Sequence, residues 1–260
     1  MPTTTTNAER YRDLEQRDWS ARDGLVEDER YLADTYLDPS ASTVEAGTGN
    51  GRIIFALKDL GFTSLTGFDL MPEFIETAKA RDVEHVIAFD VQDATDLAYP
   101  DNTFDQLLYL AQIISTVGGW DNQLKLLTEA HRIAKPEALL IVSFLSWDSR
   151  LSRPIHVLYT GYLKAIRAMF GSKTPIQSQP WLKLGDWTNL SALSDSPPYL
   201  YYFKMHEISE LIRLSGWDLS EIGSTYQISH GEPMCPDIIE LARRPIRGAI
   251  FAICRKQRRE

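Results

Sequence analysis

The chain has 260 residues, of which 43% are hydrophobic and 24% are charged, and its formal net charge is -9. This composition suits a globular protein with one well-buried core, and the negative charge makes a nucleic-acid backbone a poor partner for the molecule as a whole. No stretch approaches the roughly 20 apolar residues of a membrane helix, and the first residues lack the pattern of a secretory signal. Cys235 and Cys254 are too few and too far apart for a disulfide framework or a zinc site, so a cytoplasmic protein is expected.

Between Thr43 and Trp147, short β-rich runs alternate with helical patterns. This alternation predicts βαβ units and therefore a parallel sheet. The expected strands are Thr43–Ala46, Ser64–Phe68, His85–Phe89, Phe104–Leu110 and Ala138–Leu145. The expected helices are Arg52–Leu60, Pro72–Ala80 and Asn122–Ala134.

The alternation is interrupted from about Asp148 to Leu200. Apolar residues recur at helical spacing in Ile155–Phe170, with Lys164 and Arg167 on the other face, which predicts an amphipathic helix whose apolar side packs on the core. The composition of residues 171–198, rich in Ser, Pro, Gly and Trp, predicts mostly loop. The alternation resumes with a helix at His206–Leu214, a strand after Gly216 and a last strand at Gly248–Cys254.

These patterns predict one α/β domain with a Rossmann-like, mostly parallel seven-stranded sheet, helices on both faces and an insertion of helix and loop. Its parts are an N-terminal helical arm (1–42), a core (43–147), the insertion (148–200) and a C-terminal helix with the last strands (201–260). Loops at the carboxyl edge of an open α/β sheet carry function. We therefore expect the insertion to lie over the strand ends and to form part of a binding pocket.

A glycine-rich segment, Val44-Glu45-Ala46-Gly47-Thr48-Gly49-Asn50-Gly51-Arg52, joins the first expected strand to a helix. Small residues let a ligand approach the backbone, and the start of the helix offers free N–H groups. Dinucleotide-binding loops share these features, but their pattern is G-x-G-x-x-G. Here the glycines fall as G-x-G-x-G, and Arg52 stands in the place of the third glycine.

Three acidic residues lie at the ends of the first three expected strands: Glu45 before the loop, Asp69 closing the second strand and Asp93 after the third. A carboxylate at Glu45 repels a pyrophosphate but suits a ligand with an ammonium and a sulfonium group, which favours S-adenosylmethionine (SAM) over NAD. Asp69 is placed to accept hydrogen bonds from ribose hydroxyls, and Asp93 to accept one from an adenine amino group. An NAD-dependent oxidoreductase is the alternative that Glu45 and Arg52 disfavour.

In combination, these segments resemble the class I SAM-dependent methyltransferases, in particular the branch that acts on small molecules. Residues 45–51 are similar to the cofactor loop of that family and residues 68–70 to its ribose-binding strand end. Residues 93–94 are similar to its adenine-side segment, and residues 99–105 to the run into its fourth strand. The resemblance implies cofactor contacts at Glu45, Gly47, Thr48, Gly49, Gly51, Arg52, Asp69, Leu70, Asp93, Ala94 and Leu110.

The resemblance extends over about 43–146 and, more weakly, over 203–256. The helix end at 129–136 also fits, with one departure. The family usually has a glycine after the Lys-Pro pair, whereas Glu137 and Ala138 follow Lys135-Pro136 here. This change affects a turn remote from the expected cofactor site.

The acceptor of the methyl group is not specified by these motifs. Ser196-Pro197-Pro198-Tyr199 has the form of a motif with which DNA and some protein methyltransferases hold a nitrogen atom, but that motif belongs directly after the fourth strand. Tyrosines and tryptophans crowd the insertion, and an apolar, aromatic or cationic molecule suits such a surface. We therefore predict transfer to an O or N atom of a small, partly apolar metabolite and not to nucleic acid.

His230 follows an expected strand and is the candidate general base.

Tyr11 and Trp19 lie in the arm, a region that closes over the cofactor in similar enzymes. The basic residues from Arg243 to Arg259 allow peripheral contact with a membrane, without insertion. The sequence indicates no oligomeric state, and a non-catalytic SAM-binding protein is a second alternative.

Overall fold

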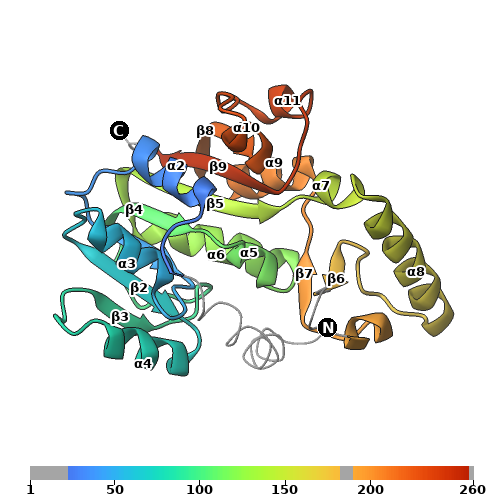
Figure 1. Ribbon diagram of the computed structural model, residues 1–260, viewed down its shortest axis with the longest axis horizontal. Coiled ribbons are helices and arrows are strands. Elements are labelled where there is room, and N and C mark those ends of the chain that lie inside the picture. The colour runs from blue at the N-terminus through green and yellow to red at the C-terminus, as the bar shows by residue number, and fades with distance from the viewer. Residues whose placement is uncertain (1–22, 182–189, 258–260) are drawn as a thin grey trace.

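The computed structural model describes residues 23–181 and 190–257, and its centre is a sheet of seven strands in the order β3-β2-β1-β4-β5-β9-β8 (Figure 1). Strands β1 to β5 pair in parallel, and β9 pairs antiparallel with both β5 and β8. The bounds are β1 Thr43–Ala46, β2 Leu65–Asp69, β3 Ala88–Val91, β4 Phe104–Tyr109, β5 Ala134–Leu145, β8 Trp217–Ser224 and β9 Ala249–Lys256. The prediction of a mostly parallel seven-stranded sheet is confirmed.

Helices cover both faces of the sheet and bury a separate apolar layer on each. Successive residues of a strand point to opposite faces, so Leu107 of β4 joins one layer and Leu108 joins the other. Helices α6 and α9 pack on the first face, and α2, α3 and α4 on the second. The helix bounds are α2 Glu27–Tyr36, α3 Arg52–Asp59, α4 Pro72–Arg81, α5 Ile113–Thr116, α6 Trp120–Ile133, α9 Met205–Leu214, α10 Thr225–Ser229 and α11 Ile238–Leu241.

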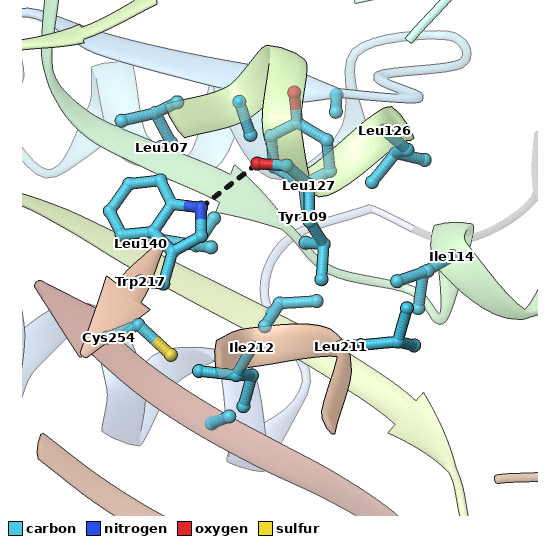
Figure 2. Packing of buried hydrophobic residues seen from close by; sticks show 14 of the residues in the cluster. Leu107, Tyr109, Ile114, Leu126, Leu127, Leu140, Leu211, Ile212, Trp217 and Cys254 are labelled. Carbon is cyan, nitrogen blue, oxygen red and sulfur yellow. Dashed lines mark hydrogen bonds between the residues drawn. The ribbon is translucent and has the colours of Figure 1, made fainter. Parts of the chain in front are cut away.

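Trp217 links the C-terminal strands to the centre of the first layer (Figure 2). Its indole packs near Leu140 and Cys254, and its Nε1 donates a hydrogen bond of 3.0 Å to the main-chain oxygen of Leu127 in α6. The indole nitrogen therefore keeps a partner although the ring is buried, as a core tryptophan requires.

The strand expected at His85–Phe89 begins later, at Ala88. His85 has a left-handed backbone with φ 53°, and its N–H donates to the carbonyl of Asp82. The Asp82 carboxylate then accepts the N–H of Ile87. These local bonds form a turn that replaces the first residues of the strand, because an Asp side chain offers the backbone an alternative to a sheet.

The insertion consists of α7 (Trp147–Leu151), α8 (Pro154–Phe170), the short paired strands β6 (Ser178–Pro180) and β7 (Tyr199–Tyr201), and the 3-10 helix η1 (Leu190–Ser194). Figure 1 shows α8 at one end of the molecule, beyond β6 and β7 and away from the sheet. The expectation that its apolar stripe packs on the core is therefore wrong. Among the residues of the stripe, only Tyr159 and Leu163 are buried.

The inner side of α8 is held by polar contacts within the insertion. Arg167, expected on the outer face, instead forms a buried ion pair with Asp195 at 2.6 Å, and the Tyr159 hydroxyl donates to the carbonyl of Ala192. Periodicity shows that one face of a helix is apolar but does not show what covers it. No helix in the described ranges is long and apolar enough to cross a membrane.

Glu137 occupies a position suited to glycine at the start of β5. Its φ of 68° is left-handed, the side chain is exposed, and the pairing of β4 with β5 shifts register beside it. The resemblance described above implies a glycine at this turn. A side chain costs about 1–2 kcal/mol in this conformation, against about 0.5–1 kcal/mol for the extra freedom of glycine in the unfolded chain.

We expect Glu137→Gly to stabilise the protein by about 0.5–1 kcal/mol, because the strain removed exceeds the entropy added. Urea unfolding of the variant and the wild type measures the difference. Pro136→Gly, at the preceding residue, is the control and should not stabilise. Loss of stability in Glu137→Gly would contradict the account of this turn.

Candidate functional site

A cavity of about 420 Å³ lies at the carboxyl ends of β1, β2 and β4, where the strand order reverses direction. Ligands of open α/β sheets bind at such a switch point, and the volume is in the range of small-molecule sites. The carboxyl ends of the strands supply one side of the cavity. The segment after β4, the end of β5 and the insertion supply the other.

The glycine loop between β1 and α3 passes close to its neighbours at two positions. Gly47 has a φ of 64°, and a Cβ atom there would lie 2.5 Å from Cδ1 of Ile113. A Cβ atom on Gly67 of β2 would lie 2.9 Å from Oγ1 of Thr48. The missing side chains therefore let the loop fold back over the strand ends.

Glu45 is buried at the base of the loop and lines the cavity. The Thr48 hydroxyl donates a hydrogen bond of 2.6 Å to its Oε2 atom. Burial raises the pKa of the Glu45 carboxyl to about 8, and neither this hydrogen bond nor the positive charge of Arg52 cancels that effect. A cation placed in the cavity would favour the ionised form of this carboxyl.

Asp69 ends β2 and faces the cavity beside the loop. One carboxylate oxygen accepts the N–H of Gly49 at 3.0 Å, and the other accepts the N–H of Met71 at 2.9 Å. Burial raises the pKa of Asp69, although these backbone hydrogen bonds act in the opposite direction. Asp69 therefore fixes the loop while its carboxylate remains at the cavity wall.

Asp93 lies on the same side of the cavity, after β3. Its Oδ1 atom accepts hydrogen bonds of 2.8 Å from both the N–H and the hydroxyl of Thr95, which orient the carboxylate. Leu70, Ala94 and Leu110 also line the cavity. The structure thus brings together the acidic residues and the neighbours that the sequence predicted at this edge.

Arg52 lines the cavity but is directed toward α2. Its guanidinium makes two hydrogen bonds to the Glu29 carboxylate, of 2.6 and 2.7 Å, and both side chains are largely buried. A bidentate pair of this kind is among the stronger charged contacts. Arg52 therefore attaches α2 to the start of α3, and its contact with a cofactor stays a prediction.

The opposite side of the cavity is apolar and aromatic. Its residues come from the segment after β4, the end of β5, the insertion and the residues directly after it: Ile113, Thr116, Val117, Leu145, Trp181, Leu200 and Tyr202. The guanidinium of Arg150 lies over the Tyr202 ring, 4.7 Å from its centroid. All the charged residues that line the cavity, as far as the structure describes it, belong to the other side.

Most residues of this apolar wall were not predicted from the sequence. It depends on a tight turn after β4, where Ala111 and Gln112 have left-handed φ values of 49° and 58°. The N–H of Gln112 donates to the Ser143 hydroxyl at 2.8 Å, which holds the turn against β5. Residues other than glycine are strained in the left-handed conformation, and such residues gather at functional sites. Alanine and glutamine are not typical of this conformation, so the sequence did not indicate the turn.

His230 does not reach the cavity, so its prediction as the general base is wrong. It follows α10, is exposed, and stacks on Tyr226 with ring centroids 4.0 Å apart. The preceding strand, β8, is at the edge of the sheet and is separated from β1 by three strands. The order of the elements along the chain did not show that β8 lies so far from β1 in the sheet.

Tyr11, Trp19 and Trp187 lie outside the described residues.

The comparisons with known proteins agree with this geometry. Residues 44–142 match a family described as a methyltransferase domain. Norajmaline N-methyltransferase of Rauvolfia serpentina is 30% identical over 138 residues, which are 50% of this chain and 45% of that protein. The matched region thus spans about half the length of this relative.

Solved structures share the fold at low identity. A SAM-dependent methyltransferase of Methanosarcina mazei has a TM-score of 0.65 and 16% identity, over 88% of this chain and 98% of that one. The 1,6-didemethyltoxoflavin-N1-methyltransferase of Burkholderia thailandensis, solved with 1,6-didemethyltoxoflavin and S-adenosylhomocysteine, has a TM-score of 0.57 and 15% identity. That match covers 98% of this chain and 87% of the other.

Residues 44–142 thus match a methyltransferase domain, and the fold of the chain is that of solved SAM-dependent methyltransferases. The residues of this methyltransferase domain fit SAM as its cofactor, because buried carboxyls surround a loop that could receive a cationic, ribose-bearing ligand. A pyrophosphate at the same place would meet Glu45 and Asp69. The alternative of an NAD-dependent oxidoreductase is therefore not supported.

The stability of the ligand-free methyltransferase domain should depend on pH through Glu45. Its folded-state pKa of about 8 lies above the ordinary value of 4.5, so the unfolded chain releases this proton first as pH rises and stability falls between those values. The variant Glu45→Gln has no carboxyl at this position and therefore does not lose stability in this way. The unfolding free energy of the variant relative to that of the wild type should thus rise by about 3 kcal/mol from about pH 5 to about pH 8.

Urea unfolding at both pH values, without SAM, measures this gain. Glu76→Gln, on the exposed side of α4, is the matched control for losing one carboxyl. A difference between Glu45→Gln and the wild type that stays constant with pH would contradict a proton held at Glu45.

Proposed function

We propose that the protein transfers the methyl group of SAM to an O or N atom of a small, partly apolar molecule. The observation that carries this proposal is the division of one cavity into a side with carboxyls and a side with apolar and aromatic residues. The first side suits a cofactor with ribose hydroxyls and positive charge. The second suits an acceptor that is largely uncharged.

On the cofactor side, Asp69 would accept hydrogen bonds from the ribose and Asp93 one from the adenine amino group. The loop from Gly47 to Gly51 would face the methionine part, and Glu45 would lie near its positive charge. Bound SAM supplies a methyl group on an activated sulfonium. The protein then has to hold the acceptor in line with that group and exclude water, and positioning can supply much of the rate enhancement.

On the acceptor side, Trp181 and Tyr202 present aromatic surface to a small molecule. Burial raises the pKa of the Tyr202 phenol, and the nearby Arg150 opposes this effect only in part. The phenol is therefore neutral near pH 7 and can orient a polar atom by a hydrogen bond. The names of the Rauvolfia and Burkholderia proteins as N-methyltransferases favour nitrogen as the acceptor atom.

Asp69→Ala should weaken SAM binding by about 1.5–3 kcal/mol, the range for hydrogen bonds that involve a charged group. Calorimetric titration measures this change. Asp101→Ala, before β4 at the opposite edge of the sheet, is the control and should bind SAM like the wild type. Unchanged SAM affinity in Asp69→Ala would contradict the proposal that Asp69 binds the ribose of SAM.

Trp181→Ala should leave the SAM dissociation constant within about twofold, because this residue belongs to the acceptor side, and should lower methyl transfer by about tenfold or more. Labelled SAM incubated with separate RNA, protein and small-molecule fractions of a cell extract provides the assay. Label in RNA or protein alone would refute a small acceptor. SAM binding without label in any fraction would instead support the non-catalytic alternative.

A further inference from the structure

The outward side of α8 carries a row of exposed apolar side chains. Ile155, Leu158 and Met169 share one face of the helix, and Phe170 extends the row at its end. Tyr162 borders this row, and its hydroxyl donates to the carbonyl of Leu193 in η1. Leu158, Met169 and Phe170 are 70%, 71% and 77% exposed. We call these five residues the α8 face. Contiguous apolar surface of this kind marks an interaction site in a natural protein.

The chain around the α8 face is basic although the protein as a whole is acidic. No Asp or Glu occurs from Ser149 to Trp181, whereas five Arg and Lys residues do, and the whole chain has a net charge of -9. Arg153 precedes the helix, Lys164 lies on its flank and Lys173 follows it, and all three are exposed. The surface offered to a partner is therefore apolar with a positive border.

The position of α8 leaves this face accessible. Figure 1 shows β6, β7 and η1 on the inner side of α8 and the end of the molecule on its outer side. The described C-terminal residues lie at the far end of the molecule. There, Lys256 belongs to β9 and donates to the carbonyls of His131 and Ala134. The basic residues at the described end of β9 are thus remote from the apolar surface.

We propose that the α8 face docks the protein on the surface of an anionic lipid bilayer. Apolar side chains of an interfacial helix enter the boundary between headgroups and acyl chains, while flanking Lys and Arg meet the lipid phosphates. Charge complementarity favours this occupant over a second copy, because a symmetric dimer would bring the positive borders of two copies together. The docking does not depend on the identity of the methyl acceptor.

Sedimentation of the full chain with vesicles tests this proposal. We expect binding to phosphatidylcholine vesicles that contain about one third phosphatidylglycerol, and weaker binding to phosphatidylcholine alone or at high salt. Leu158→Glu should weaken binding to the anionic vesicles about tenfold or more, because it places a charge where an apolar side chain enters the lipid. Lys164→Glu should reduce binding to the anionic vesicles and not to the neutral ones.

Ile239→Glu, at an exposed apolar residue of α11 with 67% exposure, is the matched control and should bind vesicles like the wild type. Circular dichroism and SAM titration establish that each variant is folded. Absence of wild-type binding to anionic vesicles, or equal loss in Ile239→Glu, would overturn the proposal. So would a dimer in light scattering that Leu158→Glu converts to a monomer, because a second copy would then cover the α8 face.

Discussion

Two hydrogen bonds from the glycine loop to the carboxyls of Glu45 and Asp69 determine the shape of the site. The Thr48 hydroxyl donates to Glu45 and the Gly49 N–H donates to Asp69, so adjacent parts of the loop are attached to the ends of β1 and β2. Gly67 leaves the space that Thr48 needs to make the first of these bonds. Because Glu45 is buried and Asp69 is half-buried, their carboxyls interact more strongly with a bound cation than surface carboxylates would.

This arrangement separates the tasks of the two sides of the cavity. The core of the domain supplies the acidic side, through elements whose positions follow from the parallel sheet. The insertion supplies Trp181 and Leu200, which can change without disturbing the loop. A fold that keeps one side constant and varies the other can serve many acceptors, so the fold alone does not define the substrate. The same insertion also carries the α8 face.

The sequence predicted the acidic side because its signals are local. Glu45 lies near the end of a strand pattern, Asp69 and Asp93 each follow one, and parallel strands end at one edge of a sheet. The apolar side was less predictable, since Ile113 reaches the cavity through the left-handed turn at Ala111 and Gln112. His230 was placed wrongly because the position of β8 in the sheet is a long-range property. The apolar periodicity predicted the helix α8 correctly, but it did not show that the apolar side of this helix does not pack on the core.

The structure of a complex with S-adenosylhomocysteine tests the central claim most directly. We expect the ribose on Asp69, the adenine toward Asp93 and the amino-acid part along the loop from Gly47 to Gly51. The sulfur atom should face the wall formed by Ile113, Trp181 and Tyr202. A ligand bound with its sulfur toward the carboxyl side, or bound outside this cavity, would contradict the division between a cofactor side and an acceptor side.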